Sequence, residues 1–100
     1  MQYLVSTHPS AVAALLDIID YIRTELQNEA AAIKQYQDFL SAIQSLEINA
    51  TLYQVYIRTE SGIEYRRINV NNYAMLYVVL DNSVEIVKIF HGSQDITVTD

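Results

Sequence analysis

The chain has 100 residues, of which 51% are hydrophobic, with only two Gly, one Pro and no Cys. This composition indicates a single domain, residues 1–100, and excludes a disordered chain, a disulfide-rich scaffold and a cysteine-based metal site. Twelve acidic and six basic residues give a net charge of −6, which disfavours non-specific nucleic-acid binding because acidic surfaces repel phosphates.

The first half of the chain is predicted to be a strand followed by two helices. Met1–Ser6 alternates weakly and predicts a strand, after which Thr7 or Ser10 is expected to cap a helix that spans Ala11–Gln27. Asn28 is expected to cap a second helix over Glu29–Glu47. The apolar residues of both helices recur at helical spacing. In the first helix they form one stripe of Val12, Leu15, Leu16, Ile19, Ile22 and Leu26. In the second helix the residues expected to face inward are Ala32, Ile33, Tyr36, Phe39, Leu40, Ile43 and Leu46.

The second half is predicted to be an antiparallel meander. Residues 48–61 fit two interpretations equally well, an additional edge strand or an irregular connector that touches the core through Leu52 and Tyr53. Three strands rich in Val, Ile and Tyr follow, separated by short Asn- and Asp-containing turns: Glu64–Val70, Tyr73–Leu80 and Val84–Phe90. The middle strand is nearly all apolar and is therefore placed at the centre of the sheet. The tail from Gly92 to Asp100 is expected to extend briefly or fray.

Together these elements predict an α+β fold of the order β-α-α-β-β-β, with three or four strands in the meander. A helical hairpin packs on one face of a mostly antiparallel sheet. The other face is expected to be free and to carry the function.

No membrane segment, metal site or cofactor is expected from the sequence. No apolar run approaches the roughly 20 residues that cross a bilayer. The N-terminus lacks the basic segment followed by a hydrophobic stretch that marks a secretory signal. We also find no metal-ligand cluster, phosphate-binding glycine loop or nucleophile motif. We therefore expect a cytoplasmic protein without a cofactor and without membrane association.

Several local motifs, in this order, resemble the RelE/ParE superfamily of bacterial type II toxins. The resemblance runs from about Leu4 to Ile96. It rests on a Pro-containing start to the first helix and on four short motifs: Asp20-Tyr21-Ile22, Tyr65-Arg66-Arg67-Ile68, Asn72-Tyr73-Ala74-Met75-Leu76-Tyr77 and His91-Gly92-Ser93-Gln94-Asp95-Ile96. The last motif is closer to the ParE (plasmid stabilisation) branch than to the RelE branch.

The resemblance implies a growth-inhibiting toxin that a cognate antitoxin neutralises, with an oligomer of toxin and antitoxin as a further implication. ParE-like members act on DNA gyrase, whereas RelE-like members cut mRNA on the ribosome. Family toxins are usually basic, and many carry Arg where this chain has Ser93 and Gln94. The acidic charge therefore favours a ParE-like inhibitor that binds its target. The alternatives are a RelE-like ribosome-dependent endoribonuclease and a degenerate binding module without toxicity.

Arg67, His91 and Glu64 are the catalytic candidates if the protein is a ribonuclease. Arg67 offers a planar cation for a phosphate or an acidic antitoxin segment, His91 is a general acid or base, and Glu64 is its partner. The competing interpretations are an ion pair between Arg67 and Glu85, and a structural His91 that bonds Asp95 or a backbone carbonyl. The reaction requires all three side chains to converge on one sheet face.

The binding candidates are Arg66, Arg67, Tyr73, Tyr77 and Asp95. Arg66 and Arg67 are neighbours in a strand and point to opposite faces, and Arg67 shares its face with Asn69. Tyr73 and Tyr77 share a face, and as core residues they are more in keeping with this composition than as a base-stacking platform. Asp95 orients His91 or caps the turn at Gly92.

Overall fold

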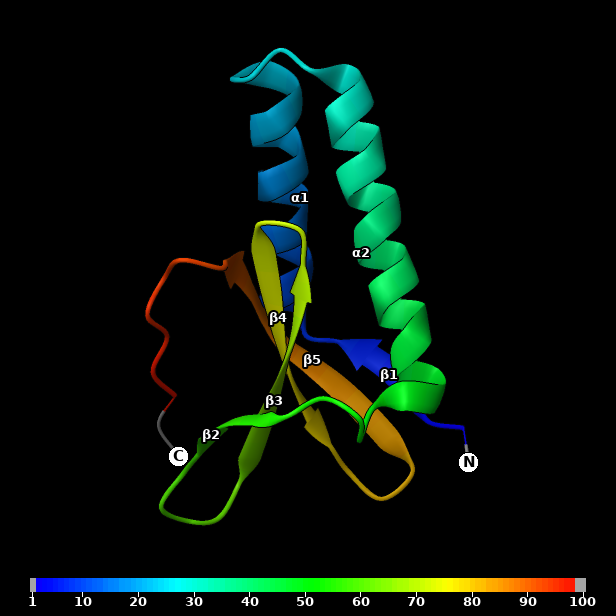
Figure 1. Cartoon of the computed structure of the whole chain (residues 1–100), viewed down its shortest axis with the longest axis vertical. Coiled ribbons are helices and arrows are strands. Elements are labelled where there is room, and N and C mark those ends of the chain that lie inside the picture. Colours follow the sequence, from blue (N-terminus) through cyan, green and yellow to red (C-terminus); the bar gives the residue numbers. More distant parts are fainter. Residues whose placement is uncertain (1, 99–100) are drawn as a thin grey trace.

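Two helices and five strands make up the computed structural model, which describes residues 2–98 (Figure 1). In chain order they are β1 (Leu4–Thr7), α1 (Pro9–Thr24), α2 (Glu29–Asn49), β2 (Val55–Arg58), β3 (Glu64–Val70), β4 (Tyr73–Val79) and β5 (Ser83–His91). The predicted α+β order is confirmed, with strand and helix ends shifted by a few residues. The predicted first strand began at Met1, which lies outside the described residues.

The five strands form one mixed sheet in the order β1-β5-β4-β3-β2. β1 pairs parallel with β5, and the other three pairings are antiparallel. β4 is the central strand, as its apolar sequence predicted. Its residues Ala74, Met75, Leu76 and Tyr77 are all fully buried, because β4 is covered on both of its faces.

Both helices begin with a side-chain cap, but the first cap is not the one predicted. Thr7 ends β1, and His8 caps α1 by accepting a hydrogen bond at Nδ1 from the Ser10 amide, 3.1 Å away. Pro9 follows as the first helical residue, where its missing N–H is not needed. Asn28 caps α2 as predicted, with its Oδ1 3.0 Å from the Ala31 amide.

The segment that the sequence left open contains an edge strand. α2 continues to Asn49, and β2 then pairs with β3 through an irregular register between Val55 and Ile57. Of the two residues expected to touch the core, Tyr53 packs against it, whereas Leu52 is 76% exposed. The connector is fixed at Ala50, whose carbonyl accepts a 2.6 Å hydrogen bond from the Tyr77 hydroxyl.

The sheet face away from the helices was expected to be free, but part of it is covered. A small apolar cluster of Ala74, Leu76 and Phe90 lies there, and Ile96 and Val98 of the C-terminal segment pack against it. Residues 92–98 therefore do not simply fray, because their two apolar side chains cover this face. Residues 99–100 lie outside the described part of the chain.

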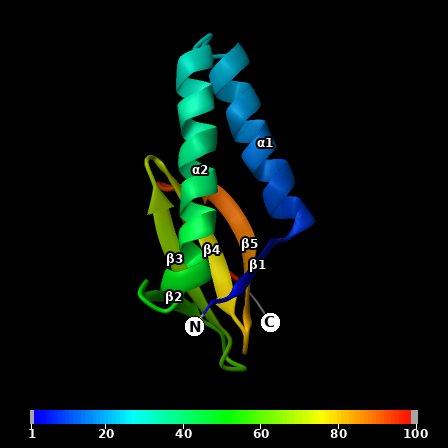
Figure 2. The ribbon, with the colours of Figure 1, turned by 90° about the vertical axis from the view of Figure 1, so that its right-hand side faces the viewer.

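The helical hairpin carries more apolar side chains than the sheet can cover. Figure 2 shows that its far end projects beyond the strands. The expectation that the apolar residues of α2 face inward is wrong for Ile33, Tyr36 and Leu40, which are exposed. Three residues of the apolar stripe in the predicted first helix are exposed as well: Val12, Leu16 and Leu26. No helix within residues 2–98 is long and apolar enough to cross a membrane.

Candidate functional site

Arg67 lies on the sheet face opposite the helices, where its guanidinium group is held by neighbouring groups of the same chain. Its Nε donates to Asn69 Oδ1 at 2.9 Å, and its Nη2 donates to the Gly92 carbonyl at 3.0 Å. The guanidinium carbon lies 4.9 Å from the centre of the Tyr56 ring and 5.3 Å from that of Phe90. Arg67 is therefore a clamp between β3 and the end of β5.

The observed contacts of Arg67 differ in two ways from those predicted from the sequence. No ion pair with Glu85 forms, since Glu85 is in β5 and pairs with Val78 of β4, which separates β3 from β5. Tyr56 was not among the candidates because its segment had no firm assignment. The i,i+2 spacing of Arg67 and Asn69 did predict their shared face.

Gly92 is the position at which the C-terminal segment turns away from β5. Its amide donates to the Asn72 carbonyl at 2.8 Å. A Cβ added at Gly92 would lie 3.1 Å from that carbonyl oxygen and 3.5 Å from Arg67 Nη2. The absence of a side chain at Gly92 therefore allows the close approach on which the Arg67 clamp depends.

The His91 ring lies on the opposite face of the sheet, the face that the helices cover. His91 pairs with Tyr73, and the two rings meet edge to face with centres 5.5 Å apart. Tyr73 in turn packs on Phe39 of α2 at 5.8 Å. The Nδ1 atom of His91 is 2.7 Å from Ser93 Oγ and also accepts from the Ser93 amide.

A bulge in β5 determines the face from which His91 points. Leu76 pairs with Lys88, but the next residue of β4, Tyr77, pairs with Ile86. One extra residue, Val87, thus enters β5, and such an insertion reverses the faces of all residues beyond it. Without the bulge, simple alternation from Ile86 would place His91 on the same face as Arg67.

Glu64 and Arg66 are engaged at the other end of β3. Glu64 accepts from Arg58 Nε at 3.0 Å and forms an ion pair with the same guanidinium group. Arg66 Nη1 donates to the Thr51 and Tyr53 carbonyls and so holds the connector before β2. Six residues of β3 separate Glu64 from the turn beside His91, which corresponds to about 20 Å along the strand.

The remaining binding candidates are divided between core and surface. Tyr77 is fully buried, and burial raises its pKa to about 12. Tyr73 packs between Phe39 and His91. Asp95 is exposed and forms no hydrogen bond or ion pair within residues 2–98. The turn it was expected to cap is instead closed by Gln94, whose Oε1 accepts from the His91 amide at 3.1 Å.

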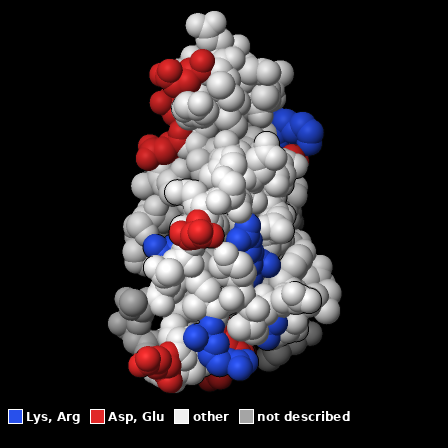
Figure 3. All heavy atoms as spheres, turned by 60° about the vertical axis from the view of Figure 1, so that its left-hand side comes forward, with Lys and Arg blue, Asp and Glu red and all other residues white. Residues whose placement is uncertain are grey.

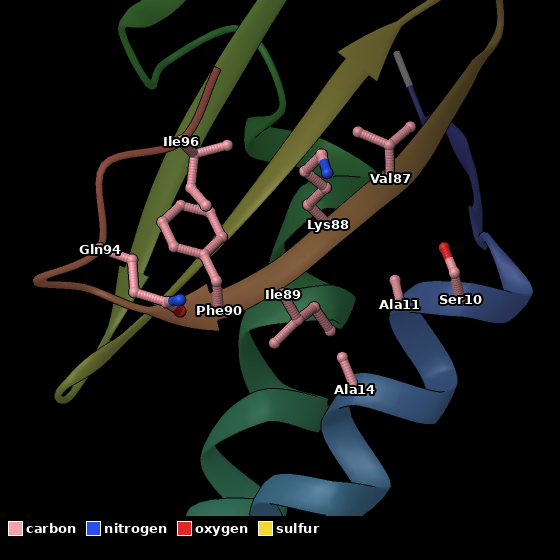
Figure 4. A pocket seen from close by; sticks show the side chains of 9 residues that line it. All are labelled: Ser10, Ala11, Ala14, Val87, Lys88, Ile89, Phe90, Gln94 and Ile96. Atoms are coloured by element: carbon pink, nitrogen blue, oxygen red, sulfur yellow. The ribbon is translucent and has the colours of Figure 1, made fainter. Parts of the chain in front are cut away.

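A hollow of about 330 Å³ lies between the start of α1, β5 and the C-terminal segment (Figure 4). Its walls include Phe90 and Ile96, and its polar side chains are Ser10, Lys88 and Gln94. Lys88 is the single charged residue in this lining and forms no ion pair within the described residues. The hollow contains neither a carboxylate nor an imidazole, so it offers no acid–base pair.

The charged side chains are unevenly distributed over the surface. In the view of Figure 3, most basic groups lie over the sheet, whereas acidic groups gather at the end of the helical hairpin and at the lower end of the sheet. No group of three or more His, Asp or Glu side chains suited to a metal ion occurs within residues 2–98. The three catalytic candidates, Arg67, His91 and Glu64, do not meet.

Comparison with protein families gives one match over nearly the whole chain. The model of the ParE toxin of the type II toxin–antitoxin system, parDE, matches residues 5–96. No curated protein is significantly similar to the chain in sequence.

Solved structures share the fold at low sequence identity. The chromosomal ParDE toxin–antitoxin system from P. aeruginosa superposes with a TM-score of 0.70 and 18% identity, covering 90% of this chain and 96% of the other. The archaeal RelE–RelB complex from Pyrococcus horikoshii OT3 gives 0.63 and 21%, covering 95% and 100%. The YoeB dimer from Staphylococcus aureus gives 0.54 and 19%, covering 91% and 98%.

Proposed function

Because the chain belongs to the ParE toxin family of type II toxin–antitoxin systems, we propose that it inhibits bacterial growth by binding a target protein, with DNA gyrase as the expected target. A cognate antitoxin neutralises it in this proposal. Inhibition of the target and neutralisation by the antitoxin would both take place in the cytoplasm, where target and antitoxin would be found. The chain acts through its surfaces and performs no chemical step itself.

The observation that carries this proposal is the separation of Arg67 from His91. A ribonuclease that uses the 2′-hydroxyl as nucleophile needs a cation at the phosphate and an acid–base pair within hydrogen-bond reach. Here Arg67 and His91 leave opposite faces of the sheet, and Glu64 lies near the far end of β3 in an ion pair with Arg58. The RelE-like alternative would require β5 to lose its bulge and the Arg67 clamp to open.

The partner proposed for neutralisation is an antitoxin with an excess of Lys and Arg. The net charge of −6 gives the whole surface an attraction for a basic segment. Solved structures that share the fold include the RelE–RelB complex and the ParDE system, which supports a toxin–antitoxin complex for this chain as well. A strongly acidic antitoxin segment would argue against this part of the proposal.

The experiment that tests the proposal measures growth arrest after induced expression in a bacterial host. We compare wild type with His91→Ala and Arg67→Lys, and we check by circular dichroism that each variant is folded. Arrest that survives both changes supports a binder. Loss of arrest in a folded His91→Ala variant would instead support the ribonuclease.

Two assays with purified protein then identify the target. Inhibition of DNA supercoiling by gyrase is expected, and cleavage of mRNA on ribosomes is not. A wild-type protein that causes no arrest and inhibits neither system would be a binding module that keeps the family fold without toxicity.

A further inference from the structure

Half of β5 has an open edge beside the start of α1. β1 pairs only with Ser83–Ile86, although β5 continues to His91. Within the described residues, no strand lies against Val87–His91 on that edge. The hollow of about 330 Å³ shown in Figure 4 lies along this open edge, and we call it the β5 edge hollow. The residues of α1 that line it have small side chains, which leave the edge accessible: Ser10, Ala11 and Ala14.

The open edge of β5 offers backbone hydrogen bonds at Ile89. The Gly92 amide donates to the Asn72 carbonyl, and alternate residues of a strand point their backbone groups to opposite edges. The amides and carbonyls of Ile89 and His91 therefore face the open edge. Both groups of His91 are bonded to Gln94, at 3.1 Å to its Oε1 and at 3.0 Å from its amide. The two groups of Ile89 have no strand to pair with and remain for a ligand.

The β5 edge hollow is closed at both ends, so it suits the end of a chain. At one end Gln94 occupies the edge, as described above. At the other end the His8 amide donates to the Ile86 carbonyl at 2.8 Å, and α1 begins directly after His8. The open part of β5, Val87–Phe90, spans only about 10 Å. An internal segment would have to enter and leave within this length, whereas a chain terminus only has to enter.

The charge in the β5 edge hollow selects a carboxyl terminus over an amino terminus. Lys88 is the single charged residue of the lining, and it takes part in none of the ion pairs found within residues 2–98. The first turn of α1 contains no acidic residue, so the positive end of its dipole adds to the charge of Lys88. A carboxylate is attracted by both groups, whereas an ammonium group is repelled by both.

The walls of the β5 edge hollow favour an apolar last residue. Ile89 and Phe90 are 5% and 6% exposed, and Ile96 of the C-terminal segment packs against the cluster that contains Phe90. Figure 4 shows Ile96 beside the Phe90 ring and Ile89 on the side of Ala14. An apolar side chain in contact with these walls removes hydrocarbon surface from water.

A second hollow, of about 420 Å³, is less suited to a carboxylate. It is lined by Arg66 but also by Glu64, whose negative charge opposes that of a carboxylate. Arg66 already donates to the carbonyls of Thr51 and Tyr53. The unpaired Lys88 therefore distinguishes the β5 edge hollow from this second one.

We propose that the β5 edge hollow binds the carboxyl terminus of a partner protein that ends in an apolar residue. The terminal carboxylate lies at Lys88, and the last peptide group bonds to the backbone of Ile89. The last side chain packs against Phe90 and Ile96. This inference goes beyond the proposed function and does not depend on growth inhibition.

The test uses a fluorescein-labelled hexapeptide, Gly-Ser-Gly-Thr-Val-Leu, in three forms, and binding to the whole chain is measured by fluorescence anisotropy. The first form has a free carboxylate, the second is amidated, and the third continues beyond Leu with Ser-Gly-Ser. We expect the first form to bind at least about tenfold more tightly than either of the others. Equal binding of the amidated form would refute the role of the carboxylate. Equal binding of the extended form would assign the hollow to an internal segment and overturn the proposal.

Replacement of one lysine at a time separates the charge in the hollow from the charge of the whole protein. Lys88→Met should reduce the preference for the free carboxylate over the amide to less than about twofold. Lys34→Met is the matched control, because it removes the same charge from α2, where Lys34 pairs with Asp38. This control should keep the preference of wild type. Equal losses in the two variants would attribute the preference to net charge and overturn the proposal.

Two further measurements locate the peptide and identify its class. Ala14→Leu places a larger side chain in the hollow and should weaken binding of the free-acid peptide at least about tenfold. An Ala14→Leu variant that is folded by circular dichroism and binds like wild type would refute the location. N-acetyl-leucine has the same terminal carboxylate but no further residues, and we expect it to compete at least about tenfold more weakly than the unlabelled peptide. Equal competition would assign the hollow to a small carboxylic acid rather than to a protein terminus.

Discussion

Replacing Arg67 tests whether this side chain is a structural clamp or a functional group. Arg67→Ala removes hydrogen bonds of 2.9 Å and 3.0 Å to Asn69 and to the Gly92 carbonyl, together with the contacts to the Tyr56 and Phe90 rings. Because Arg67 is partly exposed, we assign about 1 kcal/mol to each hydrogen bond and about 0.5 kcal/mol to each ring contact. Water recovers part of this sum, so the expected loss is about 2 kcal/mol.

The free energy of unfolding is measured by urea denaturation followed by circular dichroism. A loss of about 2 kcal/mol corresponds to a decrease in Tm of roughly 8 to 16 °C for a domain of this size. Arg67→Lys keeps the charge but loses the planar fork, so it should lose about half as much. A loss below about 0.5 kcal/mol in Arg67→Ala would refute the clamp. Loss of growth arrest in an Arg67→Lys variant as stable as wild type would mean that Arg67 contacts the target.

Three further predictions concern stability. Tyr77→Phe should cost about 1 to 2 kcal/mol in urea denaturation, because the buried Ala50 carbonyl loses its donor; no measurable loss would mean that another donor replaces it. Burial raises the pKa of Tyr77 from 10.0 to about 12, so wild type should lose stability as pH rises through this interval, and Tyr77→Phe should lack that step. Hydrogen bonds from Asn71 and Lys34 lower the pKa of Asp38. This stabilisation is present above the ordinary pKa and is lost as the pH falls through the lowered pKa. The free energy of unfolding of Asn71→Ala should therefore decrease less than that of wild type as the pH is lowered.

Much of the fold could be predicted from local patterns. The β3 strand begins and ends where predicted, and the nearly all-apolar β4 is central. Only a strand covered on both sides can bury consecutive side chains, as β4 does from Ala74 to Tyr77. The helix boundaries depended on caps. Asn28 was recognised because Asn is a common cap, whereas His8 was missed because imidazole seldom has this role.

The candidate site was less predictable, because it depends on the faces to which side chains point. Alternation correctly placed Arg67 with Asn69, two residues apart in one regular strand. It could not place His91 relative to Arg67, since the two belong to different strands and the extra Val87 in β5 reverses the alternation between Ile86 and His91. A sequence does not mark such an insertion, because the bulge is defined by the partner strand.

The sequence by itself determined the family, the order of helices and strands, and the acidic charge, because each depends on residue types and their spacing along the chain. Only the tertiary structure decided which apolar helix residues are buried and which sheet face each candidate residue occupies. Helical spacing assigns Phe39 and Leu40 to one broad apolar arc, but the width of the surface on which α2 packs leaves Phe39 buried and Leu40 exposed. For the same reason, the separation of Arg67 and His91 comes from strand pairing, a property of contacts between segments distant in sequence.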